Sequence, residues 1–138
     1  MSGQWMILAL TARLGWDLSM ADAVRAFTNA DLEEVLYVEL PEGVVAEFDG
    51  AVGKLQKSLY GIVQASRNWN ALLVVSLLEL GLEQCKADLC LFRWMLDGDP
   101  VLIMLIHVDD MLMASNGSKH ALDIVQGLKK KFPVEYLG

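Results

Sequence analysis

The sequence has few of the residues that define several protein classes. Its 138 residues include two cysteines, Cys85 and Cys90, too few for a disulfide framework or a zinc site. Only three prolines are present, and no repeat or Pro- or Ser-rich linker divides the chain. We therefore predict a single domain with reduced cysteines, which is typical of an intracellular protein.

Basic charge is also scarce. Lys and Arg total 11 against 18 Asp and Glu, so the formal net charge is −7. A domain that grips a nucleic-acid backbone by itself needs clustered Lys and Arg to neutralise phosphates. The composition therefore argues against independent binding of nucleic acid.

Long apolar runs are missing. The apolar N-terminal stretch lacks a basic start and ends at Arg13 and Asp17, so it is neither a signal peptide nor a membrane span. The richest later run, 101–106, has the length of a buried strand. Because 54% of residues are hydrophobic, intrinsic disorder is excluded and a sizeable core is expected.

Hydrophobic periodicity predicts helices mixed with short antiparallel strands. Helices are predicted over 4–14 with a stop at Gly15, from Gln64 to a stop at Gly81, and from 116–118 to the lysines at 129–131. Strands are predicted over 17–24, 35–40, 52–59, 89–95, 101–108 and 111–114, with a turn at 97–100. The expected fold class is α+β.

Two adjacent carboxylates, Asp109 and Asp110, interrupt an otherwise apolar stretch. In a tight turn between two strands, both side chains can lie near one point. Carboxylate oxygens suit Mg²⁺, which binds one or two of them and keeps its other positions for water and phosphate. A solvated turn is the alternative, and it is the simpler explanation for the pair alone.

A third carboxylate changes that balance. Asp22 lies near the end of the strand predicted over 17–24. If this strand lies beside the Asp109–Asp110 turn, three carboxylates converge, which is enough for two Mg²⁺ ions and an in-line phosphoryl transfer. Sequence spacing alone leaves the adjacency open.

Six segments together resemble the reverse transcriptases of copia-type retrotransposons, in order and spacing over essentially the whole chain. They are 22–34, 37–43, 54–69, 80–92, 107–110 and 128–138. The resemblance implies a partial reverse transcriptase domain over 1–138, with a palm-like antiparallel sheet packed on helices, incomplete fingers and no thumb. It also implies RNA-directed DNA polymerase activity by two-metal nucleotidyl transfer, with Mg²⁺ or Mn²⁺ as cofactor.

The resemblance implies partners as well. They are an RNA or DNA template-primer and deoxynucleoside triphosphates in the full-length enzyme, and the remainder of the Pol polyprotein, with no membrane. An active element would place the protein in cytoplasmic virus-like particles.

The resemblance assigns roles to individual residues. Asp22, Asp109 and Asp110 match the catalytic, metal-binding carboxylates, and the backbone carbonyl of Ala23 is a further expected ligand. Of these, Asp22 and Asp109 are expected to bind the metals most directly.

Further positions match the substrate-binding parts of the family. Phe27 matches the aromatic that excludes a ribonucleotide 2′-OH, although a core aromatic is the alternative. The nucleotide and template pocket is matched by Tyr60, Gly61 and Gln64, where a turn leading into a helix is equally consistent. The neighbourhood of the primer terminus is matched by His107 and Val108.

The chain departs from the family pattern at several positions. His107 replaces the usual tyrosine, and Val24 and Val63 replace lysines. Ala30 replaces a glycine, which would cost about 1 kcal/mol if the backbone there needs positive φ. Together with the incomplete fingers and the absent thumb, these changes suggest a fragment. Three interpretations stay open: a polymerase domain active inside a longer polyprotein, a non-catalytic remnant, or an acidic interaction domain that reuses the fold.

Overall fold

A computed structural model describes residues 3–30, 36–45, 50–57 and 64–138. Its helices are α1 (Gly3–Leu14), α2 (Ala26–Asn29), α3 (Ala65–Glu79) and α4 (Ser118–Lys129). Its strands are β1 (Asp17–Ala23), β2 (Tyr37–Glu39), β3 (Val52–Lys54), β4 (Glu83–Gln84), β5 (Leu91–Leu96), β6 (Asp99–His107), β7 (Asp110–Ser115) and β8 (Val134–Tyr136).

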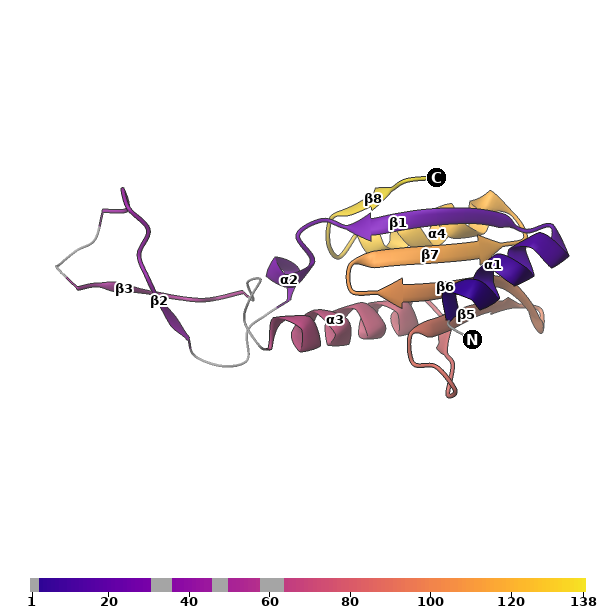
Figure 1. Ribbon diagram of the computed structural model, residues 1–138, viewed down its shortest axis with the longest axis horizontal. Helices are drawn as coiled ribbons and strands as arrows, with labels where there is room; N and C mark the ends of the chain where they lie inside the picture. The colour runs from indigo at the N-terminus through magenta and orange to yellow at the C-terminus, as the bar shows by residue number, and fades with distance from the viewer. Residues whose placement is uncertain (1–2, 31–35, 46–49, 58–63) are drawn as a thin grey trace.

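An antiparallel sheet in the order β4-β5-β6-β7-β1-β8 forms the body of the protein. One face carries α1, and the other carries α3 and α4 (Figure 1). The hairpin of β2 and β3 projects away from this body. The predicted α+β class with an antiparallel sheet is confirmed.

The main core lies between the sheet and the helices α3 and α4. Because side chains alternate along a strand, every second residue of the central strands enters this core. Trp69 and Leu73 of α3 meet Phe92, Leu102 and Met104 of the sheet there, all fully buried. This core fixes α3 against the strands that lead into the aspartate turn.

A smaller core lies under α1 on the opposite face. Ile7 of α1 is fully buried with Leu91 and Ala114, and Leu105 and Leu112 pack against them. This helix therefore covers only part of its face of the sheet, and the end of the face that carries the aspartates stays accessible.

Glycines end two of the helices as predicted. Gly15 after α1 and Gly81 after α3 both have positive φ, of 66° and 94°. The next residue's N–H then bonds back into the last helical turn, from Trp16 to the Thr11 carbonyl and from Leu82 to the Leu77 carbonyl. This is the geometry that favours glycine after a helix.

Several expectations need correction. The strands β4 and β8 were not predicted, and the strands expected over 35–40 and 52–59 are shorter in the structure, at β2 and β3. Ala30 has extended backbone with φ of −87°, so the cost considered for replacing a glycine there does not arise. Val63 lies outside the described residues.

Candidate metal centre

Strand register brings the three predicted aspartates together. Asp22 of β1 is the direct cross-strand partner of Asp110, the first residue of β7, and Asp109 lies in the turn just before it. Each carboxylate offers one oxygen within 4.8 Å of the other two. The convergence left open by sequence spacing is confirmed.

The environment of Asp22 disfavours its negative charge. Its Oδ1 atom is buried and has no hydrogen-bond partner. Burial is the largest cause that raises the pKa of Asp22 above its ordinary value of 3.8, followed by the charges of Asp109 and Asp110. A hydrogen bond with the Asp110 carboxyl and the charge of Glu135 raise the pKa further. A bound cation would relieve this repulsion.

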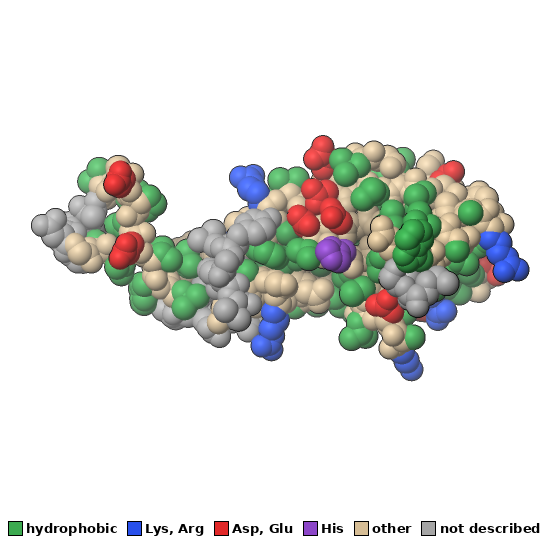
Figure 2. Space-filling model, in the orientation of Figure 1, with side chains coloured by type: hydrophobic (Ala, Val, Ile, Leu, Met, Phe, Trp, Pro, Cys, Tyr) green, Lys and Arg blue, Asp and Glu red, His purple; other side chains and the backbone are tan. Residues whose placement is uncertain are grey.

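The site contains a fourth acid that sequence analysis missed. Glu135 of β8 is exposed and is the cross-strand partner of Asp22 on the side away from Asp110. On the far side of Asp110, its partner on β6 is His107. One row across four strands therefore reads His107, Asp110, Asp22, Glu135, and acidic side chains gather beside a histidine on this face (Figure 2).

The turn between β6 and β7 is tight. His107 and Asp110 are cross-strand partners, so only Val108 and Asp109 make the connection. Val108 has φ of +56°, a conformation that a β-branched residue rarely adopts. Its carbonyl accepts a 2.6 Å hydrogen bond from Trp69 Nε1, and the Asp109 carbonyl accepts a 2.9 Å bond from the Ala23 N–H. The turn is thus bonded to α3 on one side and to β1 on the other.

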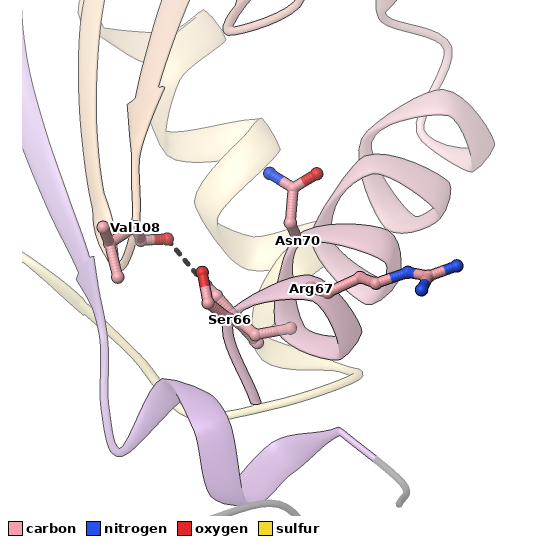
Figure 3. A pocket seen from close by; sticks show the side chains of 5 residues that line it. Ser66, Arg67, Asn70 and Val108 are labelled. Atoms are coloured by element: carbon pink, nitrogen blue, oxygen red, sulfur yellow. Dashed lines mark hydrogen bonds between the residues drawn. The ribbon is translucent and has the colours of Figure 1, made fainter. Parts of the chain in front are cut away.

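Two hollows lie beside the turn that carries the aspartates. A pocket of about 490 Å³ lies between α3 and the turn, where Ser66 lies next to Val108 and the Arg67 side chain points away from it (Figure 3). On the opposite face, a groove of about 420 Å³ runs from apolar side chains such as Leu8 and Met20 to His107 and Asp110. The first hollow is polar and the second is largely apolar.

Two of the remaining predicted residues are placed by the structure. Phe27 in α2 is half-buried and packs against the main core, as the alternative of a core aromatic expects, and its role at the nucleotide sugar stays a prediction. Gln64 directly precedes α3, and its carbonyl accepts a bond of 2.9 Å from the Asn68 N–H. Tyr60 and Gly61 lie outside the described residues.

Comparison with known families decides the relationship. Residues 3–138 match the family model described as reverse transcriptase (RNA-dependent DNA polymerase). The chain belongs to this family. The reverse transcriptase match includes all three aspartates and almost the entire chain.

Relatives of this reverse transcriptase segment are transposon proteins. The Retrovirus-related Pol polyprotein from transposon TNT 1-94 of Nicotiana tabacum is 34% identical over 96% of this chain and 10% of its own length. The corresponding protein from transposon RE2 of Arabidopsis thaliana is 31% identical over 94% of this chain and 9% of its length. The Truncated transposon Ty1-A Gag-Pol polyprotein of Saccharomyces cerevisiae is 25% identical over 94% of this chain and 10% of its length.

The resemblance to copia-type retrotransposon enzymes is therefore confirmed. The chain spans about a tenth of the length of the curated relatives that it matches. No solved structure matched the chain. Among the described residues, no helix has both the length and the apolar character needed to cross a membrane.

Reverse transcriptases generally use Mg²⁺, and the residues present fit such an ion. The converging ligands are all hard carboxylate oxygens, which Mg²⁺ and Mn²⁺ prefer. Asp22 also has an oxygen, Oδ1, that is buried without a hydrogen-bond partner, as expected for an atom whose partner is a bound cation.

Proposed function

We propose that this chain forms the palm of an RNA-directed DNA polymerase within a copia-type Pol polyprotein, with two divalent cations bound by Asp22, Asp109 and Asp110. The convergence of these three carboxylates within 4.8 Å at one end of an open sheet face is the observation that carries the proposal. Family membership supplies the reaction class.

The chain's own residues have separate tasks in this scheme. Asp22 and Asp109 are half-buried and bind the cations most directly, while the exposed Asp110 completes the site at its solvent side. The Ala23 carbonyl is a further ligand. When bound, the two cations stabilise the attacking and leaving oxygens of an in-line nucleotidyl transfer.

Other residues would position the substrates. Phe27 lies in α2, which follows β1, and would exclude a 2′-OH on the sugar of the incoming nucleotide, in addition to its packing role. The segment with Tyr60, Gly61 and Gln64 would line the nucleotide and template pocket. His107, the last residue of β6, and Val108 directly precede the aspartates and, as the resemblance implies, would lie next to the primer terminus.

Metal binding gives the direct test. Melting of the 138-residue chain should shift upward with Mn²⁺, because an ion that binds only the folded state stabilises it by mass action. The affinity should be weak, on the order of a millimolar, since substrate phosphates normally complete the coordination. At tenfold that concentration the gain is about 1.4 kcal/mol.

Asp22→Asn should abolish this shift, and Asp17→Asn should retain it. The control residue lies on the same strand, carries the same charge and pairs with Ser115 instead of an acid. Identical Mn²⁺ responses of the parent and Asp22→Asn would exclude a shared site.

Polymerase activity needs a second test, because the chain with net charge −7 is not expected to extend a primer alone. In a chimera, this chain replaces the matching segment of the tobacco relative. We expect deoxynucleotide incorporation on a primed RNA template that is lost with Asp109→Asn. A chimera that binds Mn²⁺ but incorporates nothing would instead favour a non-catalytic remnant.

A further inference from the structure

We propose that Trp69 is a positioning residue for the aspartate turn: its indole N–H fixes the backbone of Val108 and thereby the position of Asp109. This inference rests on the proposed metal-binding function. It adds a residue that makes no contact with substrate or metal and acts through the turn that carries one of the ligands.

The turn needs an external restraint. Its first connecting residue, Val108, has φ of +56°, where turns of two residues usually place glycine. A valine in this region is strained, because its branched Cβ approaches the backbone closely. Such a conformation persists only where surrounding contacts determine it. Left to its local preference, this backbone would return to negative φ and rotate the next residue, Asp109.

Trp69 provides a restraint at the required atom. Its Nε1 donates to the Val108 carbonyl at 2.6 Å, a short bond between residues far apart in sequence. The carbonyl belongs to the peptide unit that leads directly into Asp109. Fixing this peptide plane fixes the orientation from which the carboxylate projects toward Asp22.

The donor itself is rigidly placed. The Trp69 side chain is 1% exposed in the main core. Its ring meets that of Phe132 edge to face, with the centroids 5.0 Å apart. The buried indole thus holds the Val108 carbonyl at a fixed position relative to the core.

A polar pocket opens beside this bond, lined by Ser66, Arg67 and Asn70. If the indole N–H is removed, water from this pocket can reach the Val108 carbonyl and hydrogen-bond to it. Loss of the donor should therefore affect the geometry of the turn more than the stability of the fold.

The experiment measures Mn²⁺ affinity by calorimetry for the parent, Trp69→Phe and Phe132→Leu. Trp69→Phe keeps an aromatic ring but removes the donor, and we expect Mn²⁺ binding to weaken on the order of fivefold, the equivalent of one hydrogen bond. Phe132→Leu removes the ring contact but keeps the donor, so it should lower the melting temperature and leave Mn²⁺ affinity within twofold, roughly.

A Val108→Gly background separates positioning from packing. Glycine adopts positive φ without strain. In this background Trp69→Phe should weaken Mn²⁺ binding less than in the parent, because there is less strain to restrain. An equal loss in both backgrounds would contradict the proposed role.

A second measurement needs no substitution at Trp69. In the parent, Mg²⁺ should slow hydrogen exchange of the Trp69 indole N–H, because ion binding and the turn geometry are coupled reciprocally. The indole of Trp5, which is 65% exposed, serves as the internal reference. Should Trp69→Phe fail to fold, an indole exchange rate that Mg²⁺ leaves unchanged overturns the inference.

The outcomes distinguish the two proposals. A parent chain that binds no Mn²⁺ refutes the metal-binding function. A parent that binds Mn²⁺, with Trp69→Phe binding equally well or Phe132→Leu weakening it as much, leaves the metal site intact and refutes the positioning role.

Discussion

Replacing Asp22 by asparagine should stabilise the metal-free protein at neutral pH. The ionised Asp22 faces Asp110 and Glu135 directly across two strand pairs, and Asp109 lies in the adjacent turn. Directly opposed like charges on neighbouring strands cost up to about 1 kcal/mol each, and burial of the carboxylate adds to this cost. We expect a gain of about 1–2 kcal/mol in the free energy of unfolding, with a smaller gain in high salt.

The sign of the pH dependence follows from the raised pKa of Asp22. Between the unfolded-state pKa of this group and its higher folded-state pKa, the folded chain binds more protons than the unfolded chain. Stability therefore falls as pH rises through this window and stays lower above it. Asp22→Asn lacks this loss, so its advantage over the parent should vanish in acid and be complete above the folded-state pKa.

Thermal melts in EDTA, from acidic to neutral pH, measure the effect. For a chain of this size, the neutral-pH gain corresponds to an increase in melting temperature of roughly 3–8 °C. Asp17→Asn provides the matched loss of one charge on the same strand. A variant that melts below the parent in EDTA at neutral pH, or that gains equally in acid, would show that repulsion among these carboxylates is not the cause.

Three further substitutions probe the core around the site. Ser19→Ala should raise stability by about 1 kcal/mol in urea unfolding, because the Ser19 hydroxyl is buried without a partner, whereas Ser76→Ala should lower it by a similar amount, because that hydroxyl donates to the Leu72 carbonyl at 2.7 Å. A loss in both variants would contradict this account. Leu73→Ala should lower the free energy of unfolding by about 2–5 kcal/mol in the same assay, since the Leu73 side chain is fully buried between α3 and the sheet. If Leu73→Ala destabilises the protein less than the same substitution at the exposed Leu78, the assigned packing is refuted.

Periodicity and turn chemistry predicted most of the body of the fold. The helix stops at Gly15 and Gly81 follow from the ease with which glycine adopts positive φ, and Asp97-Gly98 predicts the tight hairpin between β5 and β6. The strand β8 could not be predicted in this way, because three residues after Pro133 are too few to show alternation. The acid at Glu135 was missed for the same reason.

The candidate site was predictable only in part. The resemblance to a known family predicted that Asp22 lies beside Asp109 and Asp110, whereas sequence spacing alone also allowed a solvated turn at 109–110. Nothing local predicts the conformation of Val108, because valine disfavours positive φ. That geometry depends on a hydrogen bond from Trp69, a contact between distant parts of the chain that no short motif encodes.

The place of β1 between β7 and β8 in the sheet has a consequence for the order of folding. The strands β5, β6 and β7 follow one another as hairpins and can pair locally, whereas β1 must insert between β7 and β8, which lie near the other end of the chain. Pairings between distant segments carry the larger entropic cost of loop closure and form slowly. During synthesis Asp22 therefore emerges long before its partners exist. The carboxylate cluster is completed only when β1 pairs with β7 and β8. A divalent cation therefore cannot nucleate this fold and can only stabilise it once it has formed.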